Sequence, residues 1–355
     1  MKEAIFHFPT DGKPCEIEQI KSGHIHETYL ITTDTGSQYI LQWINQYVFP
    51  NVNAIMNNMR AISGFLMETM HGKMPMIHYL MTKEGQTYYD DGLGGAWRAY
   101  RYVDNSICLQ RPDSLEDFYE CARAFGHFQY ALNDFPAQQL EETIPNFHNT
   151  VDRYRQLRDA IRRDEKGRRA EVGAEIDFAL QREEKACRLH HMMEDGSLPT
   201  RATHNDTKIN NVLMDKDTRK AICVIDLDTV MPGLSVYDFG DAIRFGASTA
   251  AEDEEDLSKI ALDMDKFELF TKGFLAEVDG FLTPHEIEML PVGMRVITCE
   301  LAMRFLTDYI EGDLYFKVKS PNHNLVRARA QMKLLEDMEK KADQVQAFVN
   351  GQTKI

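Results

Sequence analysis

The sequence predicts an α+β fold in two lobes, a small antiparallel sheet in the N-terminal lobe and a mostly helical C-terminal lobe. With 355 residues, 43% of them hydrophobic, the chain is too long for one simple core and apolar enough for two lobes. Short stretches rich in Thr, Tyr and Ile occur in the first hundred residues, whereas apolar residues recur at helical spacing after residue 114. We therefore expect an N-terminal lobe with a hinge at residues 1–103 and a C-terminal lobe at residues 104–355.

The N-terminal elements follow from local patterns. We expect a short helix or an extended lead-in over residues 1–20, then a turn and a strand over residues 21–33. The turn Asp34-Thr35-Gly36-Ser37 leads to a second strand at residues 38–44. Apolar residues at three-to-four spacing predict a helix over residues 51–71. Further strands are expected at residues 76–81, 86–90 and 96–102.

The C-terminal part is predicted to be helical. A helix begins at Ser114, with Asp117 three residues later as in a helix cap, and ends before Asn133. The arginines of residues 145–170 alternate with acidic residues, which favours a solvated helix face over an anion-binding patch. Further helices are expected at residues 177–194, 267–278, 284–309 and 325–349.

Composition excludes several classes of function. The net charge of −16 argues against general binding to nucleic acid or to an anionic membrane. The six cysteines are scattered with no CxxC pair, so neither zinc nor disulfides are suggested. The N-terminus lacks a signal-peptide apolar region and no apolar run approaches membrane-spanning length, so we expect a cytoplasmic protein.

The chemistry is concentrated in the segment of residues 203–215 and the strand that follows it. Asp206 precedes Asn211 by five positions, and Asp226 ends the apolar run of residues 221–225. Protein kinases use the same spacing, in which the Asp accepts the proton of the attacking hydroxyl and the Asn holds magnesium. The isolated Asp–Asn pair also fits an ordinary Asx-rich turn, but the added Lys208 and Asp226 favour a catalytic loop.

These residue types suit phosphoryl transfer from ATP. The transferring group spreads negative charge over its oxygens, and bound Mg²⁺ neutralises it. Mg²⁺ prefers carboxylate and amide oxygens, which Asp226 and Asn211 offer. Lys208, in the same loop, would direct positive charge toward the transferring group. Asp228 is either a second metal ligand or a residue that shapes the loop.

The motif His204-Asn205-Asp206 to Asn211, followed by residues 225–228, resembles the aminoglycoside phosphotransferase and choline kinase superfamily. These are small-molecule kinases with a protein-kinase-like two-lobed fold. The longer strings at residues 226–233, 237–241 and 244–246 are similar to the N-acetylhexosamine 1-kinases. The resemblance implies ATP- and Mg²⁺-dependent phosphorylation of the anomeric hydroxyl of N-acetylglucosamine or N-acetylgalactosamine. It implies a sugar site that includes Asp206, with Thr229, Phe245, Arg304 and Tyr315 as candidate contacts.

The same resemblance places the nucleotide in the N-terminal lobe. Gly23 would approach the phosphates, and the backbone at Tyr102 and Val103 would bind adenine at the hinge. The strand of residues 38–44 lacks the lysine that kinases use to pair with the phosphates, and Gln42 or Trp43 occupies its place. Either Gln42 supplies only a neutral hydrogen bond, or the phosphates are neutralised mainly by the metal and by backbone groups.

Two rival functions remain open at this point. One is a kinase of the same superfamily with another acceptor, such as choline, an amino alcohol or an aminoglycoside. The other is a non-catalytic nucleotide-binding regulator, which the missing strand lysine favours and the Asp206, Asn211 and Asp226 set disfavours. Arg304 lies among apolar residues, so it must find a polar partner, either a sugar or an internal salt bridge. The sequence does not predict the oligomeric state.

Overall fold

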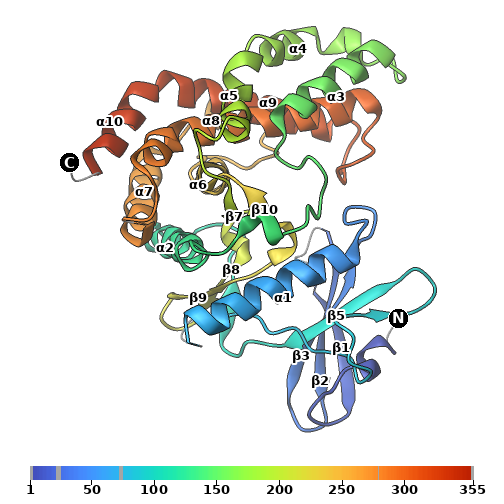
Figure 1. Ribbon diagram of the computed structural model, residues 1–355. Coiled ribbons are helices and arrows are strands. Elements are labelled where there is room, and N and C mark those ends of the chain that lie inside the picture. Colours follow the sequence, from blue (N-terminus) through green and yellow to red (C-terminus); the bar gives the residue numbers. More distant parts are fainter. Residues whose placement is uncertain (1–2, 21–24, 72–74, 279, 353–355) are drawn as a thin grey trace.

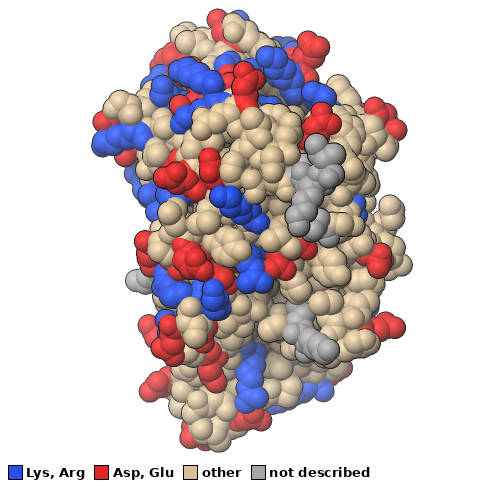
Figure 2. Space-filling model, turned by 90° about the vertical axis from the view of Figure 1, so that its left-hand side faces the viewer, with Lys and Arg blue, Asp and Glu red and all other residues tan. Residues whose placement is uncertain are grey.

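The structure is a computed structural model that describes residues 3–20, 25–71, 75–278 and 280–352. A sheet-containing part lies at one end of the molecule, and helices make up most of the other end (Figure 1). In the part of the chain that the structure describes, no helix combines the length and apolarity that crossing a membrane requires. On the face drawn in Figure 2, the visible Lys and Arg side chains are interspersed with Asp and Glu.

The N-terminal sheet has five antiparallel strands in the order β1-β2-β3-β5-β4. Within the predicted lead-in, the structure describes residues 3–20, which form a short 3₁₀ turn at Ala4–His7 and then the edge strand β1. The strand predicted at residues 38–44 is confirmed as β3. The strands are β1 (Pro14–Ile20), β2 (Glu27–Thr33), β3 (Gln38–Ile44), β4 (Tyr89–Asp90) and β5 (Ala96–Arg101).

The strand predicted at residues 76–81 is wrong. This segment touches β5 through a single bridge between Tyr79 and Tyr100 and a hydrogen bond from Leu80 N–H to Ala99 O at 2.7 Å. The chain then turns, with Thr82 N–H donating to Gln86 O, so the segment leaves the sheet before a ladder forms. Only the last two residues of the strand predicted at 86–90 join the sheet, as β4.

Helix α1 (Val52–Thr69) lies between the sheet and the helical part (Figure 1). It begins where the Asn51 side chain accepts a hydrogen bond from Ala54 N–H, which satisfies one of the free donors of the first turn. Its apolar face buries Ile55, Met59 and Ile62, as the predicted spacing requires. The prediction of a helix at residues 51–71 is therefore confirmed.

The helical part is built around the long helix α8, which packs against α6, α9 and α3. A capping box between Thr283 and Glu286 starts α8 and a left-handed Gly312 ends it. The helices of this part are α2 (Leu115–Ala131), α3 (Thr150–Arg163), α4 (Gly173–Leu180), α5 (Glu183–Glu194), α6 (Ser235–Gly246), α7 (Met264–Val278), α8 (Pro284–Glu311), α9 (His323–Lys340) and α10 (Ala342–Gln352).

Two predicted helices are each divided in the structure. Residues 177–194 belong to α4 and α5, which are separated at Arg182, whose guanidinium pairs with Glu339 at 2.8 Å. Residues 325–349 belong to α9 and α10, and the break is at Lys341, whose ammonium binds Leu262 O at 2.7 Å. The change of direction there buries Val345 and Val349 in the core.

Short strands hold the predicted catalytic segment, residues 203–215, between the two parts (Figure 1). A three-stranded sheet has the order β6-β8-β9, and a two-stranded sheet pairs β7 with β10. Their bounds are β6 (Ser106–Cys108), β7 (Arg201–Thr203), β8 (Val212–Asp215), β9 (Ala221–Val224) and β10 (Met231–Gly233). Strands β8 and β9 form an antiparallel hairpin joined by the turn at residues 216–218. Residues 203–215 therefore run from β7 to β8, and Asp226 follows β9.

Candidate active site

Helix α6 fixes the predicted catalytic loop through the side chain of Asp238. The buried Asp238 carboxylate accepts hydrogen bonds from His204 N–H at 2.9 Å and Asn205 N–H at 2.7 Å. Gln129 donates to the same carboxylate at 2.9 Å, and burial raises the pKa of Asp238 above its ordinary value. Two successive backbone donors on one carboxylate fix the loop conformation just before Asp206.

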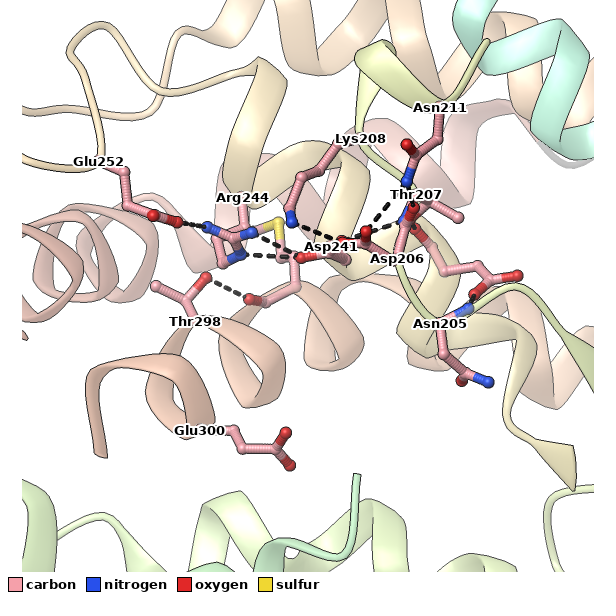
Figure 3. Close-up of polar contacts among 12 residues, drawn as sticks. Asn205, Asp206, Thr207, Lys208, Asn211, Asp241, Arg244, Glu252, Thr298 and Glu300 are labelled. Atoms are coloured by element: carbon pink, nitrogen blue, oxygen red, sulfur yellow. Dashed lines mark hydrogen bonds and ion pairs between the residues drawn. The ribbon is translucent and has the colours of Figure 1, made fainter. Parts of the chain in front are cut away.

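Asp206 lies between Lys208 and Asn211 (Figure 3). Lys208 Nζ is 2.6 Å from Asp206 Oδ1, and Asn211 Nδ2 donates to Asp206 Oδ2 at 3.0 Å. Burial alone would raise the pKa of Asp206, but the Lys208 ammonium holds it below its ordinary value. The carboxylate is therefore ionised and held in one orientation, as a group that must receive a proton requires.

A second ion-pair network lies next to Lys208. Arg244 lies between Asp241 and Glu252, with nitrogen–oxygen distances of 2.8 and 2.9 Å (Figure 3). Burial alone would lower the pKa of Lys208, but Asp206 and then Asp241 raise it. Lys208 thus stays protonated between two carboxylates from the loop and from α6.

Asp226 follows β9 in a left-handed conformation, with φ of 60°. Burial, and next the neighbouring Asp228, raise the pKa of Asp226 to about 7. Asp226, Asp228 and His26 offer ligand atoms that lie within 4.8 Å of one another. A half-buried carboxylate beside a second carboxylate suits a divalent cation, which would neutralise their charge. The hard oxygens of Asp226 and Asn211 fit Mg²⁺.

Asp228 is bound by residues that the sequence alone did not reveal. The Arg98 guanidinium, on β5, pairs with both carboxylate oxygens at 2.5 and 2.7 Å. His26 Nε2 lies 2.7 Å from Asp228 Oδ2, and Asp228 is buried. The pKa of Asp228 lies far below its ordinary value because Arg98 and His26 outweigh burial. One signal for Arg98 was present, since it is the charged residue within the otherwise apolar start of β5, residues 96–100.

The predicted nucleotide contacts are distributed along β3 and the hinge. Gln42 Oε1 accepts a hydrogen bond from Arg98 Nε at 3.0 Å, so its side chain lies next to the Asp228 ion pair. Tyr102 N–H donates to Gln38 O at 3.0 Å, and Val103 O accepts from Ser106 Oγ at 2.6 Å. Two of the four backbone groups at the predicted hinge are thus engaged within the protein. Gly23 lies outside the described residues.

The structure brings Arg304 and Tyr315 together but separates them from the other predicted acceptor contacts. Both line a cavity of about 100 Å³ on α3 and α8, and Arg304 lies over the Tyr315 ring at 5.7 Å. Thr229 is buried and its hydroxyl donates to His204 O at 2.7 Å. Phe245, on α6, packs against the main core. Neither Thr229 nor Phe245 lines this cavity.

Helix α8, which lines the cavity, is linked to the predicted catalytic loop by polar contacts of His148. His148 bridges Glu300, one turn before Arg304 on α8, at 2.8 Å and Asn205 O at 3.2 Å. Arg153 also lines the cavity, and burial together with Arg304 lowers the pKa of Arg153 to about 10. Two guanidinium groups, an aromatic ring and two carboxylates therefore line the cavity, and His148 links its helix α8 to the loop that carries Asp206.

Several solved structures share this fold. A microcompartment-associated aminopropanol kinase is 16% identical, with a TM-score of 0.67 and 97% of each chain covered. An amicoumacin kinase bound to AMP-PNP and Ca²⁺ is 15% identical, with a TM-score of 0.61 over 94% of this chain and 91% of that one. A choline kinase from Cryptosporidium parvum Iowa II is 14% identical, with a TM-score of 0.52 over 95% of this chain and 92% of that one.

These likenesses establish the two-part fold that the sequence predicts. The sequence itself matches the phosphotransferase enzyme family over residues 16–268, which include the catalytic loop and Asp226 and make up well over half of the chain. The chain belongs to that family.

Proposed function

We propose that this protein transfers the γ-phosphoryl group of ATP to a hydroxyl of a small molecule, with Mg²⁺ as the metal. The observation that carries the proposal is the ionised Asp206 carboxylate held between Lys208 at 2.6 Å and Asn211 at 3.0 Å. A carboxylate fixed in this way suits a base, and a nucleotide-binding regulator has no need of one.

The roles follow the chemistry of phosphoryl transfer. The acceptor hydroxyl oxygen forms a bond to the γ-phosphorus, the bond from phosphorus to the bridging oxygen breaks, and ADP leaves. Asp206 orients the hydroxyl and receives its proton. Asn211 and Asp226 would hold Mg²⁺, which neutralises charge on the phosphate oxygens when it is bound. Lys208 keeps Asp206 ionised and adds positive charge beside the transferring group.

For the acceptor, we propose the anomeric hydroxyl of N-acetylglucosamine or N-acetylgalactosamine, giving the sugar 1-phosphate. Sequence resemblance supports this choice, as does a cavity lined by Arg153, Arg304 and Tyr315, which offer donors and a ring to a neutral polyol. An anomeric hydroxyl is more acidic than an ordinary alcohol, which eases proton transfer to Asp206.

The second candidate is a kinase for an amino alcohol, choline or an aminoglycoside. It is favoured by the aminopropanol and choline kinases among the similar structures. The cavity is lined by two guanidinium groups and by the carboxylates of Asp308 and Glu311, so its formal charge does not separate the two candidates. Arg304 already occupies the face of Tyr315 that a cationic acceptor would use. The preference for the neutral sugar therefore rests on the sequence resemblance and on this occupied ring.

An acceptor panel tests the proposal. Purified protein with Mg²⁺ and ATP is offered N-acetylglucosamine, N-acetylgalactosamine, glucose, galactose, choline, 1-amino-2-propanol and an aminoglycoside, and ADP release is followed. We expect release with the acetylated sugars at least tenfold above the other acceptors. Release only with the amines would move the assignment to the second candidate. Nucleotide binding with no release on any acceptor would indicate the regulator.

A further inference from the structure

Protein kinases pair a lysine on the third strand with a glutamate on the following helix, and the lysine contacts the nucleotide phosphates. Neither partner is present here. The third strand, β3, carries Gln42 in the central part and has no lysine. Helix α1 has one acidic residue, Glu68, which is exposed in its last turn. A nucleotide site in this protein must therefore obtain its fixed positive charge from another element.

The neighbouring strand supplies that charge. Arg98 on β5 is the antiparallel partner of Gln42 on β3, and directly paired residues project from the same face of a sheet. Arg98 Nε donates to Gln42 Oε1 at 3.0 Å, and Arg98 Nη1 lies 3.5 Å from Met59 Sδ on α1. The guanidinium thus lies between the strand and the helix that hold the ion pair in kinases.

The contacts of Arg98 hold it in a fixed orientation close to Asp228, in the segment that follows strand β9. Its side chain is fully buried, and its guanidinium group pairs with Asp228, which lies two residues after the proposed metal ligand Asp226. A buried guanidinium is costly unless it is paired and hydrogen-bonded, so its position is tied to that carboxylate. Of its five N–H groups, the described residues accept four, which leaves one on Nη2 for a further oxygen.

We propose that Arg98 is the cation that binds the nucleotide phosphates, replacing from β5 the lysine that is missing from β3. The inference rests on the proposed function and assigns a residue within the same site. Asp228 then takes the place of the helix glutamate, as the carboxylate that orients the cation. Because both oxygens of Asp228 are engaged by Arg98 and His26, Asn211 and Asp226 would hold the Mg²⁺.

Calorimetric binding of adenosine, ADP and AMP-PNP with Mg²⁺ to the full-length chain tests the inference. If Arg98 binds the phosphates, Arg98→Gln should weaken the binding of ADP and AMP-PNP about 10- to 100-fold. The affinity for adenosine should stay within about twofold of that of the wild type. Arg101→Gln is the matched control, because Arg101 lies at the end of the same strand with its side chain 63% exposed. It should leave all three affinities unchanged. An equal loss for adenosine and AMP-PNP, or no loss, would overturn the inference.

A relocated cation gives a second test, which also serves if Arg98→Gln does not fold. The double variant Gln42→Lys/Arg98→Gln returns a positive charge to the paired position and keeps a partner for Asp228. We expect its preference for AMP-PNP over adenosine to lie within about tenfold of that of the wild type. Loss of that preference in a folded double variant would contradict the proposal. If the wild-type protein binds no nucleotide, the proposed function fails as well, so the two failures are distinguishable.

Discussion

The carboxylate of Asp238 shows how one buried side chain sets the position of the proposed base. This carboxylate accepts hydrogen bonds from two backbone N–H groups of the loop. Asp238→Asn would therefore turn an amide nitrogen toward one of those donors. We expect kcat to fall about 10- to 100-fold with nucleotide affinity nearly unchanged, measured by steady-state kinetics and calorimetry. Asp217→Asn, in the exposed turn after β8, is the control and should leave kcat unchanged. Wild-type kcat in Asp238→Asn would contradict this account of the loop.

Arg304 is the residue on which the acceptor assignment depends most. Its guanidinium lies over the rings of Phe147, Tyr315 and Phe316, so it is held in the cavity and directed by them. For Arg304→Gln we predict a 10- to 100-fold higher KM for the sugar and an unchanged KM for ATP. Arg162→Gln is the control, since that arginine is 78% exposed on α3. An equal rise in both KM values would show that Arg304 acts on the fold and not on the acceptor.

Residues within one short motif were predictable, and residues joined across the fold were not. Asp206, Lys208 and Asn211 lie within six positions, so their spacing alone predicts that they meet, and they do. The pairing of Arg98 with Asp228 joins positions 130 residues apart and depends on the register of β3 against β5. No local pattern encodes that register, so the cation on β5 was missed.

At the scale of elements, two glycines set the distance between α6 and α8. A Cβ added at Gly240 would lie 2.6 Å from the Gly293 backbone, and one added at Gly293 would lie 2.2 Å from Val236 O. Helix α6 carries Asp238 and Asp241, so forcing these helices apart displaces the groups that hold the catalytic loop. We expect Gly293→Ala to lower the free energy of unfolding by about 1–3 kcal/mol and to lower kcat, measured by denaturant unfolding and kinetics.

Gly64 on α1 provides the matched comparison for that prediction. A Cβ there would meet no atom within 4 Å, and alanine favours the helix by up to about 1 kcal/mol. Gly64→Ala should therefore leave stability unchanged or increase it. If Gly64→Ala and Gly293→Ala destabilise the protein equally, the close approach of α6 and α8 is not the cause.

The elements themselves were predictable where periodicity and caps agree. Helix α1 and strand β3 match their predicted ranges, and α2 begins at the predicted Ser114, which forms a capping box with Asp117. The breaks at Arg182 and Lys341 were not predicted, because each depends on a distant partner, Glu339 and Leu262. Tertiary contacts there override a continuous helical pattern.

For the molecule as a whole, contacts from both lobes meet at the proposed nucleotide site. Arg98 and His26 from the sheet side bind Asp228 on the helical side, so a ligand there contacts both parts. AMP-PNP with Mg²⁺ at 100 times its Kd should stabilise the protein by about 2.7 kcal/mol, seen as a rise in Tm. EDTA should abolish most of the rise, because the proposed ligands Asn211 and Asp226 would reach the phosphates only through the metal. A rise unaffected by EDTA would contradict the proposed metal ligands.

The central claim is that Asp206 receives the proton of a sugar hydroxyl during phosphoryl transfer from ATP. Phosphorus NMR of wild type and Asp206→Asn, each with Mg²⁺, ATP and N-acetylglucosamine, tests it most directly. The account predicts a sugar 1-phosphate from the wild type, and formation about 10²- to 10⁴-fold slower in the variant with AMP-PNP binding retained. Most of the wild-type turnover in Asp206→Asn, or a phosphate on another hydroxyl, would contradict it.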